Sequence, residues 1–103
     1  MNGEIDLEKA QREEARWRIL KGLDVGRPYP VGEGILLRLL ADISLPISPA
    51  GLRRELGYLQ GRDLVKLTQP PTGQWLAELT RIGIDLVEYT VDCDPGIARP
   101  ARD

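Results

Sequence analysis

Two short runs on either side of a proline- and glycine-rich turn constrain this chain most strongly. Leu64–Gln69 alternates apolar and polar residues and is rich in residues that favour strands, and Gln74–Leu79 follows the turn as a second candidate strand. Pro70–Gly73 between them has the composition of a tight turn. The pattern predicts a β-hairpin. Because the rest of the 103-residue chain has mostly helical periodicity, we expect a single, mainly α domain with this small hairpin.

The segment before the hairpin predicts a helix over Ser48–Gln60. Ser48 is a preferred N-cap residue, and Pro49 suits the first helical position. Leucines recur from Leu52 at i, i+4 and i+7, so they define the buried side of this helix. At 100° per residue, the positions that point away from the leucines are Ala50, Arg54, Gly57 and Tyr58, with Arg53 on the flank.

Three further helices are expected. The first spans Ile5–Leu23, and glycines and a proline just beyond Lys21 supply its stop signal. Its first half is mostly polar, so it is either solvated or packed on another chain. The second, Gly32–Ile43, is crowded with isoleucine and leucine and is expected to be buried. Thr80 can cap the last helix, which we expect to run through Tyr89.

The remaining segments complete the domain. Tyr29–Val31, in a proline-rich stretch, is the candidate for a third strand beside the hairpin. Residues 92–103 lack periodicity and are expected to be irregular or partly disordered. We therefore divide the chain into a polar helical extension (1–15), a core (16–91) and a tail (92–103).

The inventory of reactive side chains argues against catalysis. The chain has no histidine, so it cannot assemble a Ser-His-Asp or Cys-His site. Its one cysteine, Cys93, supplies neither an internal disulfide nor the ligands of a structural zinc. We expect no enzymatic activity, no cofactor and no metal. No secretory signal and no apolar run near the ~18 residues of a membrane span are visible, so we expect a cytoplasmic protein without membrane contact.

Charge is distributed unevenly along the chain. The formal net charge is −2, but residues 25–68 hold six Lys/Arg against four Asp/Glu. The segments on both sides have an excess of acidic residues. An anionic partner is therefore expected at the middle of the chain.

Helix, extended segment, helix, turn, helix, hairpin, helix is the order of winged-helix proteins. The run Ser48–Val65 resembles the recognition helix and wing entry of ArsR- and MarR-like regulators, and Leu79-Thr80-Arg81-Ile82-Gly83 resembles their start of the helix after the wing. Over roughly residues 16–100 the chain is similar to small winged-helix proteins of Mu-like prophages. The tracts Arg27–Glu33 and Asp94–Pro100 carry that similarity.

Two departures limit what the resemblance implies. ArsR-like metal sensors use Cys/His clusters, and this chain has only Cys93, so metal sensing is not carried over. The turn Ser44-Leu45-Pro46-Ile47 also lacks the glycine often found in helix-turn-helix turns. The resemblance then implies a phage or prophage transcriptional regulator that binds double-stranded DNA as a homodimer. The helices at Ile5–Leu23 and Thr80–Tyr89 would pair its subunits.

The candidate DNA contacts follow from placing the Ser48–Gln60 helix in the major groove. Arg53 and Arg54 would contact phosphates or a guanine edge, and backbone N–H groups at the helix N-terminus would contact a phosphate. For each position the alternative is structural: capping, solvated arginines beside Glu55, or ordinary surface. The full candidate set is Ser48, Gly51, Arg53, Arg54, Tyr58, Arg62, Lys66 and Gln74.

A second hypothesis assigns the chain to another class. A winged-helix module of a phage that binds another phage protein and not DNA would also account for the acidic termini and for a predicted wing with one lysine, Lys66. The hypotheses predict different surfaces. A regulator should show a contiguous positive strip over Arg53, Arg54, Arg62 and Lys66, whereas an interaction module should show an exposed apolar patch.

Overall fold

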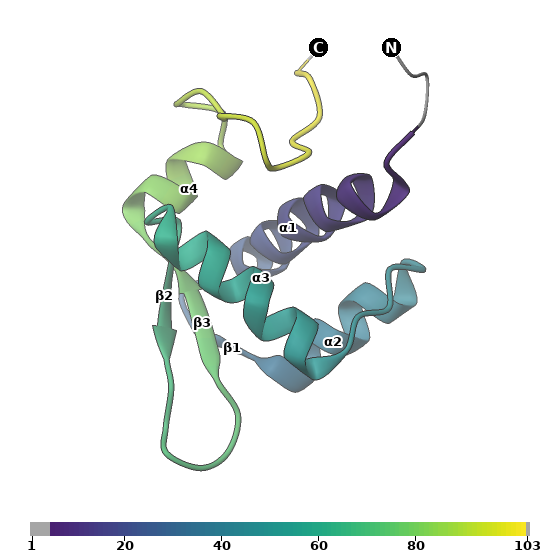
Figure 1. Cartoon of the computed structure of the whole chain (residues 1–103). Coiled ribbons are helices and arrows are strands. Elements are labelled where there is room, and N and C mark those ends of the chain that lie inside the picture. Colours follow the sequence, from purple (N-terminus) through teal and green to yellow (C-terminus); the bar gives the residue numbers. More distant parts are fainter. Residues whose placement is uncertain (1–4, 103) are drawn as a thin grey trace.

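The predicted hairpin forms and takes in a third strand. The computed structural model describes residues 5–102, so predictions for residues 1–4 and 103 lie outside the described part. Within that part, four helices and one antiparallel sheet form a single, mainly helical domain (Figure 1). The elements in chain order are α1 (Leu7–Gly26), β1 (Val31–Gly32), α2 (Glu33–Asp42), α3 (Pro49–Gly61), β2 (Val65–Thr68), β3 (Leu76–Leu79) and α4 (Arg81–Val87).

The sheet has the strand order β1-β3-β2. In the hairpin, Val65 pairs with Leu79 and Thr68 with Leu76, which leaves residues 69–75 as a long tip that extends away from the helices (Figure 1). The third strand occupies Val31–Gly32, so it begins at the last residue of the predicted Tyr29–Val31 segment. Ala77, in the central strand, is almost fully buried, so one face of the sheet joins the core.

Helix α1 continues past its predicted end at Leu23 to Gly26. Gly22 lies inside the helix and Gly26 is its last residue, and both are points of close contact. A methyl group at Gly22 would lie 3.0 Å from Leu39 Cδ1, and one at Gly26 would lie 2.6 Å from Val31 Cγ2. Missing side chains at these positions let α2 and β1 approach α1 closely.

Helix α2 is buried along one side only. Leu36 and Leu40 are fully buried, whereas Ile35 is 60 % exposed and Ile43, which follows the helix, is 40 % exposed. The expectation of a buried helix therefore holds for Leu36 and Leu40 but not for Ile35 and Ile43. A helix of ten residues that packs on α1 and α3 from one side leaves its opposite side in solvent, whatever its composition.

Helix α3 begins as predicted. The Ser48 hydroxyl accepts the Gly51 N–H at 3.0 Å, and the leucine stripe packs against α1, α2 and β2. The buried apolar residues come from every helix, from the hairpin and from the C-terminal segment: Ala15, Trp17, Ile19, Leu20, Leu23, Leu36, Leu40, Leu52, Leu56, Leu59, Leu64, Val65, Ala77, Leu79, Leu86, Val87 and Ile97.

Helix α4 starts at its predicted cap, where the Thr80 hydroxyl accepts the Gly83 N–H at 3.0 Å. Its predicted extent through Tyr89 is wrong, because the helix ends at Val87 and Tyr89 has a φ of 63°. Tertiary contacts hold Tyr89 in that conformation. Its ring packs edge-on against Trp17 with centroids 6.3 Å apart, and its hydroxyl donates to the Pro100 carbonyl at 2.8 Å.

The segment 92–102 contains neither helix nor strand, but it is packed against the domain and not disordered. Ile97 is buried in the core. The Ala98 N–H donates to the Glu13 carbonyl at 3.1 Å, and the Arg99 guanidinium donates to the Leu86 carbonyl at 2.9 Å. This segment therefore covers the side of the molecule where α1 and α4 lie together. Within residues 5–102 no helix combines the length and apolarity needed to cross a membrane.

Candidate nucleic-acid interface

The outward side of α3 carries cationic and small neutral side chains. Arg53 and Arg54 are exposed, as are Ala50 and Gly57. A methyl group at Gly57 would meet no described atom within 4 Å, so this position faces open space. Because Ala50 and Gly57, on either side of the two arginines, have small side chains or none, another molecule can approach the helix backbone closely there.

The only acidic residue among the described residues of α3 points inward. Glu55 is 4 % exposed, and its carboxylate accepts a hydrogen bond from the Arg16 Nε of α1 at 2.7 Å. Arg16 also donates to the Gly96 carbonyl and lies 3.6 Å from the centre of the Tyr58 ring. The buried Glu55 therefore compensates an internal arginine, and it does not neutralise the exposed arginines that precede it in the sequence.

Arg53 is held in place by three elements. Its Nε and Nη2 donate to the two carboxylate oxygens of Glu33 at 2.6 and 2.9 Å, and its guanidinium lies 4.4 Å from the centre of the Trp75 ring. The Trp75 N–H donates to the same carboxylate at 2.7 Å. The cluster joins α2, α3 and the base of the hairpin. Because no hydrogen bond within residues 5–102 uses Nη1, that edge of Arg53 stays free to donate.

The same contacts shift the ionisation of Glu33. The hydrogen bonds from Arg53 lower the pKa of Glu33 below its ordinary value of 4.5, and they outweigh the opposing effect of burial. The Trp75 N–H also lowers it. Conversely, Glu33 raises the pKa of Arg53 further above the ordinary arginine range. Both groups are therefore charged at neutral pH, and the ion pair fixes where the free edge of Arg53 points.

Two candidate residues at the start of α3 have structural roles. The hydroxyl oxygen of Ser48 accepts a hydrogen bond from the Gly51 N–H, as an N-cap residue does. Gly51 is buried, although it was expected among the DNA contacts at the start of this helix. A methyl group there would lie 2.8 Å from Ile47 Cγ1, so glycine allows the turn between α2 and α3 to pack against the helix.

Tyr58 and Arg62 face the C-terminal segment and not the outward side of α3. Arg62 Nη1 donates to the Tyr58 hydroxyl at 2.9 Å and to the Pro95 carbonyl at 3.1 Å. Tyr58 is half-buried beneath Arg16. The predicted strip over Arg53, Arg54, Arg62 and Lys66 is therefore interrupted at Arg62. The reason is that the tail, which has no periodic signal in the sequence, folds back and occupies Arg62 with its carbonyl groups.

The hairpin contributes one cation and a neutral tip. Lys66 is exposed on β2, and the paired position on β3 is Glu78, so the two side chains share a face of the sheet. Gln74 is exposed, and its side-chain oxygen accepts the Gly34 N–H at 2.7 Å, which attaches the hairpin to the start of α2. The exposed tip, residues 69–74, has no charged residue.

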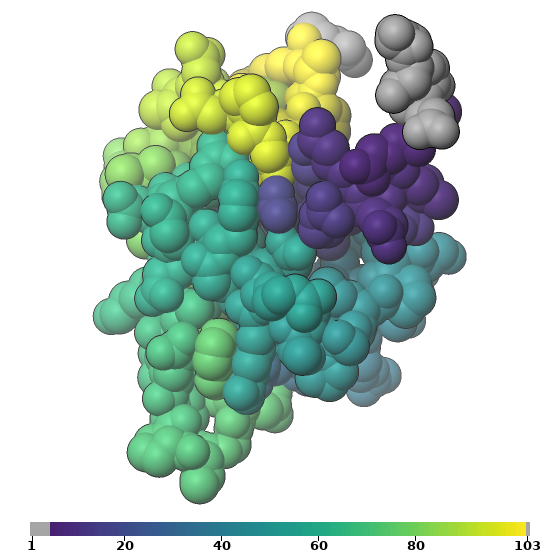
Figure 2. Space-filling model, viewed as in Figure 1, coloured from purple at the N-terminus to yellow at the C-terminus, as the bar shows by residue number. Residues whose placement is uncertain are grey.

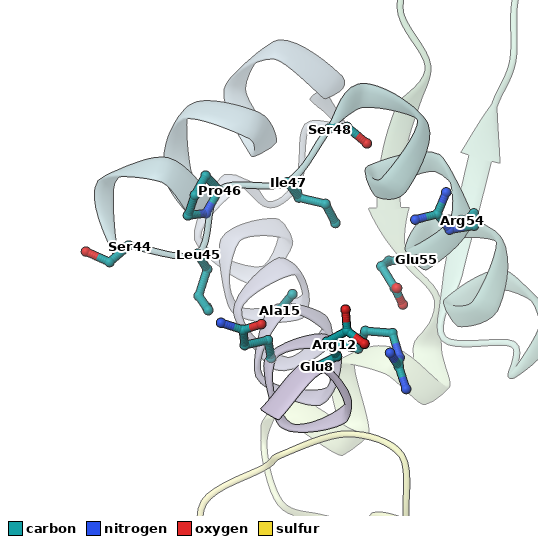
Figure 3. A pocket seen from close by; sticks show the side chains of 11 residues that line it. Glu8, Arg12, Ala15, Ser44, Leu45, Pro46, Ile47, Ser48, Arg54 and Glu55 are labelled. Atoms are coloured by element: carbon teal, nitrogen blue, oxygen red, sulfur yellow. The ribbon is translucent and has the colours of Figure 1, made fainter. Parts of the chain in front are cut away.

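Two hollows border α3. A groove of about 450 Å³ separates α3 from the start of α1 and from the turn at residues 44–48. Leu45 and Ile47 point into it, while Arg12 and Arg54 stand on opposite walls (Figure 3). A second hollow of about 420 Å³ lies between the starts of α2 and α3, and Arg53 and Gln74 border it. Arg53 and Arg54 thus lie on the two flanks of the same helix. Seen from outside, α3 crosses the middle of one face of the molecule and the hairpin tip projects below it (Figure 2).

Comparison with known proteins adds no relative. No protein-family model, curated protein or solved structure matches the chain significantly. The site is therefore defined by its own geometry. Of the eight candidates, Arg53, Arg54 and Lys66 combine an exposed position with a positive charge.

Sequence reasoning missed the residues that support Arg53. Glu33 lies 20 residues before Arg53, and Trp75 lies 22 residues after it, so no local spacing relates them. Glu33 does carry one signal: it follows Gly32 at a predicted helix start, where an acidic residue is common. That signal predicts the helix but not its arginine partner.

Proposed function

We propose that this chain adopts a winged-helix fold, binds double-stranded DNA through α3 with the β2–β3 hairpin as the wing, and acts as a homodimeric transcriptional regulator of a phage or prophage. The order of elements and the antiparallel strand order β1-β3-β2 support this fold. The proposed role is binding alone, without catalysis and without a cofactor.

The single observation that carries the proposal is the inward position of Glu55. In a protein with a net charge of −2, the outward side of α3 bears two arginines and small neutral residues, while the acidic residue next to them is 4 % exposed and bonded to Arg16. A helix that enters the major groove needs cationic or polar side chains outward and close approach of its backbone. The outward side of α3 meets both needs.

The electrostatic contribution of one subunit is modest. Arg53, Arg54 and Lys66 supply three cations, and Glu33 partly compensates one of them. Two subunits supply six, which corresponds to a slope of about −5 in a plot of log K against log [salt]. Specific affinity at physiological salt therefore requires the dimer in this proposal.

Fluorescence anisotropy of labelled duplex DNA across a salt series tests the proposal. The native chain should bind at about 50 mM salt with the slope given above. Arg54→Ala should reduce the magnitude of the slope by about 2, because two subunits each lose one phosphate contact. Arg81→Ala, which removes an arginine exposed on α4, is the matched control and should leave the slope unchanged. Absence of binding at high micromolar protein overturns the proposal.

A specific observation also favours the alternative, a winged-helix protein-interaction module without DNA binding. Val25, Tyr29 and Ile35 are large apolar side chains that are exposed within one stretch of the chain, from the end of α1 to the first turn of α2. Contiguous apolar surface marks a protein interface more often than a nucleic-acid interface. This alternative predicts no DNA binding at any salt concentration, so the same anisotropy series separates the two functions.

A further inference from the structure

Two helices leave apolar side chains that nothing within residues 5–102 covers. Val25, near the end of α1, is 83 % exposed. Ile35 of α2 and Ile43, just after it, are also exposed, at 60 % and 40 %. Scattered hydrophobic residues on a surface are ordinary, but adjacent ones mark a contact surface.

These side chains lie next to one another. Ile35, Leu39 and Ile43 recur at i, i+4 and i+8, so they form one ridge along α2, in which Ile35 and Ile43 are exposed and Leu39 is half-buried against the core. Gly22 brings α1 against the middle of this ridge, because a methyl group there would lie 3.0 Å from Leu39 Cδ1. Val25 is three residues beyond Gly22 on the same side of α1, which extends the apolar surface toward Ile35.

A pair of opposite charges borders the ridge. Arg38 and Asp42 are exposed and four residues apart, so they lie on one row of α2 beside the apolar row. We call the combined surface of Val25, Ile35, Arg38, Leu39, Asp42 and Ile43 the α2 face. In two antiparallel copies of α2, related by a two-fold axis that passes midway between Arg38 and Asp42 on their exposed side, Arg38 of each copy faces Asp42 of the other. The α2 face is therefore complementary to itself in charge as well as in apolarity.

We propose that a second copy of this chain docks on the α2 face, with the two α2 helices antiparallel about a two-fold axis. The proposed function includes a homodimer, and this inference names the surface through which it forms. It rests on the proposed function only in assuming that a dimer exists. The surface differs from the pairing of the terminal helices predicted from sequence. On that side of the molecule, Ile97 and the hydrogen bond from Ala98 to Glu13 already seat the chain's own C-terminal segment on α1.

The size of the α2 face sets the expected affinity. A standard interface buries about 800 Å² on each partner, and a ridge of three or four aliphatic side chains provides a smaller apolar centre. We therefore expect a dissociation constant in the micromolar range, and the oligomeric state should depend on protein concentration between about 1 and 300 μM.

Sedimentation velocity of the full chain over that range tests the proposal. The native protein should change from monomer to dimer. Ile35→Arg should stay monomeric throughout, and its unchanged thermal unfolding should show that it is folded. Ile82→Arg changes a residue of similar exposure on α4 (51 % exposed) and should still dimerise. A native protein that is monomeric throughout, or a dimer lost in Ile82→Arg and kept in Ile35→Arg, overturns the proposal.

Charge reversal distinguishes contact between copies from effects within one helix. Arg38→Asp and Asp42→Arg should each weaken self-association at least about tenfold, since each places like charges opposite one another. An equimolar mixture of the two variants should form a heterodimer, because the aspartate introduced at position 38 then faces the arginine introduced at position 42. No interaction within a single helix can produce that recovery. If the mixture stays monomeric, the antiparallel α2 pairing is wrong.

The outcomes separate this inference from DNA binding. If the chain binds DNA but Ile35→Arg does not prevent dimerisation, the proposal that α3 binds DNA stands and the proposed dimer through the α2 face is wrong. If the chain dimerises through the α2 face but does not bind DNA, the proposed dimer stands and the proposed DNA binding is wrong.

Discussion

Helices α2 and α3 are consecutive, rich in leucine and packed into the same core, yet their outward sides differ. Helix α3 presents Arg53, Arg54 and small neutral residues, and its acidic residue is turned inward. Helix α2 presents isoleucines beside one positive and one negative charge. Because the buried sides are alike, the difference lies in what each helix offers to a partner. An excess of positive charge suits a polyanion, whereas balanced charges around an apolar row suit a second protein surface.

The largest effect on stability is expected from removing Arg16, the partner of the buried Glu55 carboxylate. Arg16→Ala leaves the Glu55 carboxylate buried without its partner, so we expect a loss of about 3 kcal/mol in the free energy of unfolding, measured by urea denaturation. Arg18→Ala is the control, because Arg18 forms an exposed i,i+4 pair with Glu14 and should cost less than about 0.5 kcal/mol. Equal losses in the two variants would show that the Arg16–Glu55 pair has no special role.

A new acidic residue on the outward side of α3 should reduce the excess of positive charge that distinguishes α3 from α2. Gly57 is exposed and a Cβ added there would meet no described atom within 4 Å, so we expect Gly57→Glu to fold normally and to weaken DNA binding about tenfold by repulsion. Gly57→Gln has nearly the same shape without the charge. Both variants gain helix propensity, so only a difference between them in DNA affinity reports electrostatics. If both bind DNA as the native chain does, α3 is not the DNA-binding helix.

Low pH should weaken the Glu33–Arg53 ion pair and so have an intermediate effect on the stability of the fold. The pKa of Glu33 is lower in the folded state than its ordinary value of 4.5, chiefly because Arg53 donates to the ionised carboxylate. The ionised form therefore stabilises the fold above pH 4.5, and that contribution is lost as the pH falls below 4.5 through the folded-state pKa. Thermal unfolding midpoints of Glu33→Gln should decline less steeply over this window than those of the native chain. Parallel declines would contradict the assigned role of the ion pair.

The smallest expected effect concerns Tyr58, which sequence analysis placed among the DNA contacts. Tyr58→Phe removes the acceptor of an Arg62 hydrogen bond, so we expect a cost of about 0.5–1 kcal/mol in the free energy of unfolding. The affinity for DNA, measured by anisotropy, should not change, because Tyr58 faces the C-terminal segment. A loss of DNA affinity without a loss of stability would return Tyr58 to the proposed interface.

Local signals made the helices and the hairpin predictable. Ser48 and Pro49 mark the start of α3, and the turn residues Pro70–Gly73 between two short runs mark the hairpin, because capping and turn formation depend on neighbouring residues. The end of α1 was missed for a related reason. Gly22 and Gly26 resemble a stop signal locally, but their role is close packing on Leu39 and Val31, residues that only the tertiary structure brings near.

The site depended on long-range contacts and was therefore less predictable. Helical periodicity correctly assigned Arg54 to the outward side of α3. It did not indicate that Arg53 would be bonded to Glu33 or that Arg62 would be bonded to the tail carbonyl of Pro95, since these partners lie 20 and 33 residues away. Which of two neighbouring arginines stays free is decided by such contacts, and the sequence pattern does not contain them.

The most direct test of the functional separation of α2 and α3 is an NMR titration of the ¹⁵N-labelled full chain with duplex DNA. We predict that backbone amide shifts change along the outward side of α3, at Ala50, Arg53, Arg54 and Gly57, and at the hairpin-tip residues that carry an amide proton: Gln69, Thr72, Gly73 and Gln74. Amides of the α2 face at Ile35 and Leu39 should not respond to DNA, although they should shift with protein concentration. Changes centred on Ile35 and Leu39 upon DNA addition, or no changes at all, would contradict the assignment of α3 as the DNA-binding helix.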